Sequence, residues 1–209
     1  MIGRVQVNLR EMNNINYNEM EEIIIGNQIW MQHNLNVETF HNGDPIPEMK
    51  TDDEWAKAGS EKTPAWCYYG NNPDNGNVYG KLYNWYAVTD PRGIAPNGWH
   101  VPTSKEWSEL SKYLGGEDTM GDKMKSTDVQ YWVNPENKAT DKSGFSGLPG
   151  GYRYYLGMFA NIGSNGNWWF ASELDNFSAY FMYLISNDGK AHFHHNYKKN
   201  GYSLRCIKD

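Results

Sequence analysis

The chain has 209 residues, a formal net charge of −6 and an aromatic content of 15%. Such a length suits one domain, with or without a short arm, and this many aromatic residues exclude a disordered chain. A mildly acidic chain lacks the basic surface of a nucleic-acid-binding protein, and no stretch approaches the roughly 20 apolar residues of a membrane helix, so we expect neither nucleic-acid binding nor membrane insertion.

Residues 1–20 are polar and rich in Asn. We predict that they form an N-terminal arm, either flexible or contributing to oligomer formation, and that residues 21–209 form one domain. The N-terminus has no apolar segment typical of a secretory signal, so we expect a cytoplasmic or virion-associated protein unless a leader has been removed.

The domain is expected to begin with a β-hairpin. Two apolar runs, residues 23–25 and 29–31, flank the turn-forming pair Gly26-Asn27. Residues 41–65 are rich in turn formers and predict a loop, with a short helix at 52–58. Apolar residues near helical spacing then predict a first helix over residues 79–88.

A second helix is predicted after Thr103. Thr103 and Glu106 have the spacing of a capping box, in which each side chain bonds the other's backbone N–H. Trp107, Leu110 and Leu114 follow on one helical face, and Gly115-Gly116 is typical of a helix end.

Strands dominate from about residue 143. The run at 168–172 predicts a buried strand, and 179–185 predicts a strand whose two faces alternate: Ala179, Phe181, Tyr183 and Ile185 on one, Tyr180, Met182 and Leu184 on the other. The turn signal Asn187-Asp188-Gly189 leads to a return strand at 191–197, and a final strand is expected at 202–207. The order of elements predicts an α+β fold with two helices, a mainly antiparallel sheet and long loops.

Two cysteines and one basic cluster complete the residue-level predictions. Cys67 and Cys206 are expected to be buried or half-buried free thiols, although a long-range disulfide remains open. Trp168 and Trp169 are expected in the core. The densest basic group is predicted to be solvated, as short charge groups usually are: Lys198, Lys199, Arg205 and Lys208.

Several sequence blocks resemble one family. The blocks occupy residues 26–36, 66–69, 79–85, 98–103, 144–153, 166–169 and 201–206, including Gly-Trp-His-Val-Pro-Thr and Gly-Tyr-Ser-Leu-Arg-Cys. In this order they resemble the Fibrobacter succinogenes major paralogous domain family. The resemblance implies a C-type lectin-like fold of the formylglycine-generating-enzyme type, similar to the variable proteins of diversity-generating retroelements.

The chain departs from related proteins at three places. The enzyme of this fold type uses a close cysteine pair near its C-terminus, whereas Cys206 stands alone, so oxidase chemistry is not expected. The Glu-Pro-Asn or Gln-Pro-Asp and Trp-Asn-Asp motifs of calcium-dependent lectins are absent. Many family members have a Cys before the Gly-Trp-His block, where this chain has Ala95-Pro96-Asn97. We therefore predict that the protein is not an enzyme and that it binds no cofactor and no metal.

The resemblance places a variable ligand-binding surface in the C-terminal region, about residues 166–209. Tyr and similar side chains there suit recognition, because they offer large contact areas at little entropic cost. Between residues 174 and 197, only Met182 and Lys190 fall outside the set reachable by rewriting adenines of Asn codons, so active diversification and a fixed surface both remain open. The candidate ligand-binding residues are Phe170, Leu174, Asp175, Asn176, Ser178, Tyr180, Phe181, Tyr183, His192, His194 and Asn196.

The histidines of this region have a second interpretation. His192 and His194 share a strand face and can offer two metal ligands, but no third ligand follows at the usual spacing, so contact histidines are favoured. We predict a binding protein that recognises a protein or glycan. Its being the target protein of a diversity-generating retroelement is one form of this prediction. The alternatives are a non-variable adhesive or virion component and, less favoured, a formylglycine-generating-type oxidase.

Overall fold

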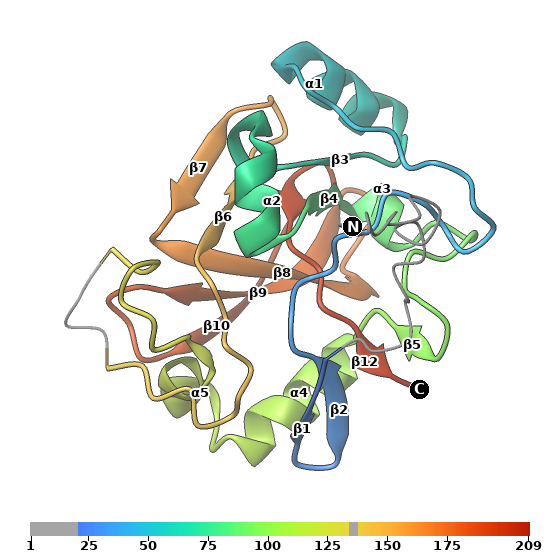
Figure 1. Ribbon diagram of the computed structural model, residues 1–209. Coiled ribbons are helices and arrows are strands. Elements are labelled where there is room, and N and C mark those ends of the chain that lie inside the picture. Colours follow the sequence, from blue (N-terminus) through green and yellow to red (C-terminus); the bar gives the residue numbers. More distant parts are fainter. Residues whose placement is uncertain (1–20, 134–137) are drawn as a thin grey trace, which may run out of the picture.

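The computed structural model describes residues 21–133 and 138–209 and shows an α+β fold built on three antiparallel sheets (Figure 1). The predicted arm, residues 1–20, lies outside the described residues. The strands are β1 (Glu22–Ile25), β2 (Gln28–Met31), β3 (Trp66–Cys67), β4 (Leu82–Asn84), β5 (Trp99–His100), β6 (Gly150–Arg153), β7 (Phe159–Ile162), β8 (Asn165–Glu173), β9 (Ser178–Ile185), β10 (Ala191–Tyr197), β11 (Gly201–Tyr202) and β12 (Ile207–Lys208).

The described residues form more helices than were predicted. They are α1 (Asp52–Glu61), α2 (Pro73–Tyr79), α3 (Trp85–Val88), α4 (Ser104–Tyr113) and α5 (Glu117–Met124), with one 3-10 turn, η1 (Tyr69–Asn71). The short helix predicted at 52–58 is confirmed by α1. Helices α2 and α5 are short and carry weak apolar periodicity, so the sequence pattern gave little sign of them. Within the described residues, no helix combines the length and apolarity needed to cross a lipid bilayer.

The predicted hairpin and the predicted helix after Thr103 are both confirmed. Strands β1 and β2 pair around Gly26, whose φ of +66° suits glycine. In α4 the Thr103 side chain accepts from the Glu106 backbone N–H while the Glu106 side chain accepts from the Thr103 N–H, as the capping box requires. Trp107 and Leu110 are buried on the inner face of this helix.

The predicted helix over residues 79–88 is confirmed only in its last turn, α3, and is wrong before it. Its middle part is strand β4, which pairs with β3 on one side and β11 on the other. Asn84 ends the strand and caps α3, because its side chain accepts from the Ala87 N–H. All three residues of β4 are buried, so no helical face exists there.

The predicted final strand over residues 202–207 is interrupted. The chain leaves the β3-β4-β11-β6-β7 sheet after Tyr202 and enters the β1-β2-β12-β5 sheet at Ile207. Between the two, the Leu204 and Cys206 carbonyls accept from the N–H groups of Leu35 and Met31. This crossing joins the two sheets, and it places Cys206 in the core.

The predicted solvation of the basic group is wrong for two of its members. Lys198 is 4% exposed and Arg205 is 2% exposed. The Lys198 ammonium lies 2.5 Å from Glu173 and 4.4 Å from the centroid of the Trp85 ring. The Arg205 guanidinium stacks over Phe145 and donates to Asn34. Aromatic rings and carbonyls replace water around these cations.

Candidate ligand-binding surface

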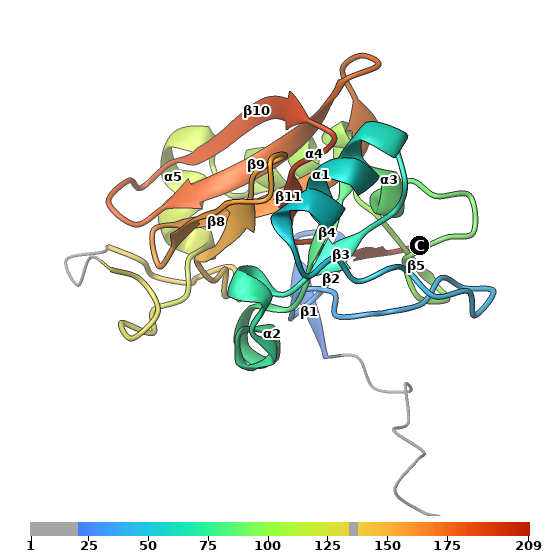
Figure 2. The ribbon, with the colours of Figure 1, turned by 90° about the horizontal axis from the view of Figure 1, so that it is seen from above.

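The region predicted to bind ligand forms a separate antiparallel sheet in the order β10-β9-β8. The strand β9 is central, and β10 returns along it with His194 opposite Phe181 and His192 opposite Tyr183. Figure 2 shows the three strands side by side, with α4 and α5 behind one face. The strands at 168–172, 179–185 and 191–197, and the turn between the last two, are therefore confirmed.

The predicted alternation of β9 is also confirmed. Ala179 and Phe181 belong to one buried cluster with Trp169 and Tyr202. Met182 and Leu184 belong to another, on the side of α4 and α5. The predicted binding residues consequently fall on two opposite faces of one sheet, and one ligand cannot cover both faces at once.

Three predicted binding residues are not available to a ligand. Phe170, Phe181 and Ser178 are only 2%, 6% and 9% exposed. Phe170 stacks against Trp107 of α4 at a centroid distance of 5.3 Å, and Phe181 lies 4.6 Å from Tyr202. Phe170 and Phe181 were predicted to contact a ligand because they are aromatic, but both rings pack in the core beneath the surface.

The face of β9 and β10 that points away from α4 and α5 carries, besides the buried Phe181, four of the predicted residues. We call this set, Tyr183, His192, His194 and Asn196, the outer face. Tyr183 and His192 stack at 4.7 Å with an interplanar angle of 13°. His194 is exposed, and the other three are half-buried. Cross-strand stacking fixes these rings before any ligand arrives, which lowers the entropic cost of binding.

Tyr180 lies on the other face, apart from this set. Together with Phe170 and Phe193 it lines a cavity of about 730 Å³ against α4 and α5. Serine and charged side chains from the two helices, among them Ser108 and Lys112, complete the lining. Tyr180 is therefore a natural control for ligand binding at the outer face.

The loop between β8 and β9 carries the remaining predicted residues. Leu174, Asp175 and Asn176 are all exposed. Hydrogen bonds from the Phe177 and Ser178 N–H groups lower the pKa of the Asp175 carboxyl below its ordinary value of 3.8. The ionised Asp175 thus holds the loop in one shape.

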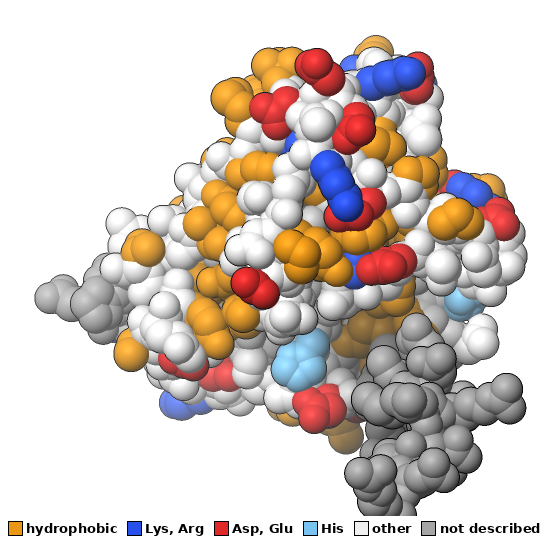
Figure 3. All heavy atoms as spheres, turned by 45° about the horizontal axis from the view of Figure 1, so that its top comes forward, with side chains coloured by type: hydrophobic (Ala, Val, Ile, Leu, Met, Phe, Trp, Pro, Cys, Tyr) orange, Lys and Arg blue, Asp and Glu red, His pale blue; other side chains and the backbone are white. Residues whose placement is uncertain are grey.

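Sequence reasoning missed two exposed aromatic residues beside this sheet and a half-buried one that contacts one of them. Phe177 is 69% exposed and Tyr197 is 49% exposed. Tyr155, from the β6–β7 turn, lies 5.4 Å from Tyr197 in an edge-on arrangement. Phe177 and Tyr197 lie inside the predicted variable stretch, so their side-chain type was a usable signal, whereas Tyr155 is brought in only by the tertiary fold. Figure 3 shows hydrophobic side chains reaching one face of the molecule among acidic and basic ones.

His192, one of the two histidines considered as metal ligands, contacts a carboxylate of its own hairpin. His192 Nε2 lies 2.8 Å from Asp188 Oδ2. Within residues 21–133 and 138–209, no three His, Cys, Asp or Glu side chains gather as metal ligands. The His192–Asp188 contact fixes the ring orientation beside Tyr183.

Both cysteines are buried free thiols, as predicted. Burial raises the pKa of the Cys67 thiol to about 12, and burial also raises that of Cys206. A thiol that stays protonated is a poor nucleophile, so these residues contribute to packing.

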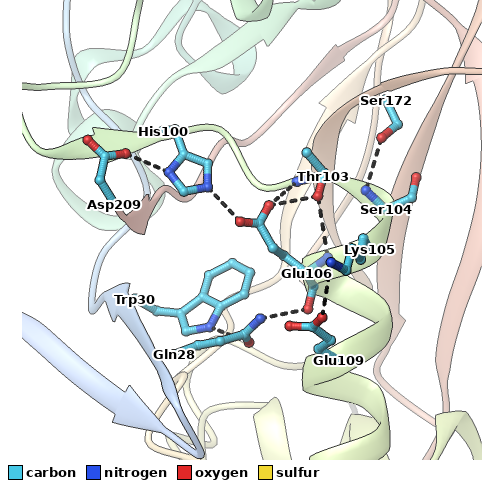
Figure 4. A network of polar contacts seen from close by, with 10 residues as sticks. All are labelled: Gln28, Trp30, His100, Thr103, Ser104, Lys105, Glu106, Glu109, Ser172 and Asp209. Carbon is cyan, nitrogen blue, oxygen red and sulfur yellow. Dashed lines mark hydrogen bonds and ion pairs between the residues drawn. The ribbon is translucent and has the colours of Figure 1, made fainter.

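A polar network joins the N-terminus of α4 to β2, β5 and the end of the chain (Figure 4). The two ring nitrogens of His100 lie 2.7 Å from Glu106 Oε1 and 2.7 Å from Asp209 Oδ1. Glu106 also accepts from the Thr103 N–H, and its carbonyl accepts from the Gln28 side chain. Because carboxylates occupy both ring nitrogens, His100 ties these segments together.

This network predicts a pH-dependent stability. Burial lowers the pKa of His100, but the hydrogen bonds to Glu106 and Asp209 outweigh it and raise the pKa above 6.5. Its stabilisation is therefore complete below about pH 6.5 and is lost as pH rises through the raised value. The ring is 37% exposed, so we expect a decrease of only about 0.5–1 kcal/mol in the free energy of unfolding between about pH 6 and 8.

Urea unfolding across this pH range measures the effect. His100→Asn should abolish this part of the pH dependence, whereas His41→Asn, at an exposed position, should leave it unchanged. A wild-type stability that rises with pH over the same range would contradict the assignment.

Comparison with known proteins identifies the chain at the level of a family. The model described as the Fibrobacter succinogenes major domain matches residues 23–208. The match confirms the family indicated by the sequence blocks and covers both the outer face and the buried cations. No curated protein and no solved structure matches the chain.

Proposed function

The chain belongs to the Fibrobacter succinogenes major domain family, and from this premise we propose that it is a binding protein, not an enzyme, that recognises a protein or glycan through the outer face. One observation carries the proposal: a stacked, partly exposed aromatic and histidine surface stands on a rigid sheet. We also propose that the α+β fold is of the C-type lectin-like type, supported by the antiparallel sheets, the helices on one face of the β10-β9-β8 sheet and the long loops.

The rigidity of the sheet favours binding at this place. The strand β9 is held on both sides, by β8 and by β10, and Trp168 and Trp169 of β8 are 0% exposed. A firm core beneath preorganised rings is what recognition surfaces on rigid scaffolds use. Tyr183 and the histidines offer flat apolar faces with polar atoms at their edges, which suits a ligand that is itself partly polar.

Active diversification of this surface is a narrower proposal within the same function. The stretch from 174 to 197 includes positions that are 0% exposed, such as Ala179 and Leu184, where polar replacements would disrupt the core. Diversification would therefore be confined to exposed positions. A neighbouring reverse-transcriptase gene, with a template repeat that differs only at adenines in codons for those positions, would establish it.

A screen on glycan and protein arrays tests the binding function. For any ligand found, the double variant Tyr183→Ala, His194→Ala should weaken binding more than tenfold, as expected when central aromatic contacts are lost. Tyr180→Ala is the matched control, since it removes a tyrosine from the same strand but from the other face. Equal effects of the control and the double variant, or full binding by the double variant, would overturn the proposed surface.

A further inference from the structure

A pocket of about 370 Å³ lies at the end of the sheet, between the β8–β9 loop, α1 and α3. Four aromatic rings wall it: Tyr86 of α3, Tyr155 of the β6–β7 turn, Phe177 of the β8–β9 loop and Tyr197 at the end of β10. Figure 2 shows β10 running toward the side of the molecule where α1 and α3 lie. We call this cavity the hairpin pocket.

The aromatic walls are held in place, and two of the four, Phe177 and Tyr197, are exposed. Tyr197 contacts Tyr155 edge-on, and the Lys198 N–H donates to the Phe177 carbonyl, so the loop and the strand end are joined. Phe177 nevertheless remains 69% exposed. Large exposed aromatic side chains around a concave surface are typical of a ligand site, because ligand binding removes their apolar surface from water.

The same pocket carries two cationic side chains without carboxylate partners. Lys62, the C-terminal cap of α1, and Lys199 line it, and neither belongs to an ion pair in the described part of the chain. The pocket lining formed by the described residues includes no carboxylate; Glu61, next to Lys62 in the chain, lies 4.0 Å from Lys57, and Glu173 lies 2.5 Å from Lys198.

The stem of the Lys199 side chain packs against Gly59 of α1. A side chain at Gly59 of α1 would lie only 3.1 Å from the Lys199 Cβ, so the absence of one lets the lysine stem pack on the helix. The Lys199 carbonyl also accepts from the Trp55 indole. Lys199 thus lines the pocket together with Ser60 and Lys62.

We infer that the hairpin pocket binds an acidic saccharide, with a sugar ring against the aromatic walls and its carboxylate between Lys62 and Lys199. The pocket volume is near the lower end of the range of about 300–1,000 Å³ found for ligand sites, which suits a small ring compound. Ser60 and the tyrosine hydroxyls supply hydrogen bonds for sugar hydroxyls. The inference rests on the proposed binding function, and it names the ligand chemistry.

Calorimetric titration of the full chain with a galacturonic acid disaccharide tests the inference. We expect binding that weakens with added salt and weakens about tenfold when the methyl ester of the same disaccharide is used. Lys62→Gln and Lys199→Gln should each weaken binding about fivefold, and Tyr197→Ala about tenfold. Lys112→Gln, which removes a lysine that lines the other cavity, should have no effect.

Each result separates this inference from the proposed function. No binding of the acidic disaccharide up to about 10 mM, or equal binding of its methyl ester, overturns the inference. Acidic-sugar binding that is lost in the Tyr183→Ala, His194→Ala double variant but kept in Lys62→Gln, Lys199→Gln and Tyr197→Ala would also overturn it, while supporting the outer face. Acidic-sugar binding that is lost in the pocket variants but kept in the Tyr183→Ala, His194→Ala double variant supports the pocket, and the array screen then tests the outer face separately.

Discussion

Arg153→Ala is expected to destabilise the protein by about 3–5 kcal/mol, among the largest effects of any single substitution in the chain. Arg153 is 0% exposed and lies in β6. Its guanidinium donates to the carbonyls of Gly157, Met49 and Thr51 at 2.8, 2.7 and 2.9 Å. Removing it takes a donor from each of the three carbonyls, of which the Thr51 carbonyl still accepts from the Trp55 N–H, and leaves a cavity beneath α1.

The aromatic surroundings of Arg153 add to this expectation. The guanidinium lies 4.9 Å from the Trp55 ring centroid and 4.6 Å from that of Phe159. Arg153 therefore links α1, β6 and β7, which is the part of the fold that supports the β6–β7 turn. The Ala variant should loosen Tyr155, and with it one wall of the hairpin pocket.

Guanidinium chloride unfolding, followed by tryptophan fluorescence, measures the loss. Arg153→Lys should be intermediate, at about 2 kcal/mol, because one ammonium keeps the charge but cannot reach three carbonyls. Arg92→Ala is the matched control: its ion pairs with Asp90 and Asp44 lie near the surface, and about 1 kcal/mol or less is expected. An Arg153→Ala variant as stable as the Arg92→Ala variant would show that the buried cation is dispensable.

The elements predicted correctly are those whose signals are local. The capping box at Thr103 and the turn at Gly26 each depend on a few neighbouring residues. The alternation along β9 needed no knowledge of the partner strands, because side chains alternate in any strand. The resemblance to the family, which covered nearly the whole chain, agrees with the family model that matches residues 23–208.

The errors arise where distant segments decide the local structure. Leu82 lies near helical spacing from Trp85 or Tyr86, but it belongs to β4, which pairs with β3 and β11, and β11 lies more than a hundred residues away in the chain. Lys198 and Arg205 belong to a short basic group of a kind that is usually solvated. In the fold, however, the rings of Trp85 and Phe145, from distant parts of the chain, pack against them. No local pattern distinguishes a buried lysine from an exposed one.

The candidate site was predicted only in part for the same reason. The strand pairing expected from the Asn187-Asp188-Gly189 turn correctly brought Tyr183 beside His192. The hairpin pocket, in contrast, combines that hairpin with Lys62 and Tyr155 from other parts of the chain. A surface made within one hairpin can be read from sequence, whereas a pocket between segments requires the tertiary fold.

Phe181→Ser is expected to cost about 3–4 kcal/mol, while Tyr183→Ser, two residues away on the same face, should cost about 1 kcal/mol. Phe181 is 6% exposed and lies 4.6 Å from the Tyr202 ring and 6.1 Å from Trp169. Tyr183 stacks on His192 near the surface, so its loss creates no closed cavity.

Thermal unfolding of the two serine variants measures this difference, which also decides where the surface can vary. A serine at 181 places a hydroxyl among aromatic rings that offer it little hydrogen bonding, so the penalty combines a cavity with an unpaired polar group. A serine at 183 is solvated. Phe181→Leu, which keeps an apolar side chain, should recover about half of the lost stability. If Phe181→Ser and Tyr183→Ser prove equally stable, the boundary between core and binding surface must lie deeper than Phe181, and position 181 must be counted among those that can vary.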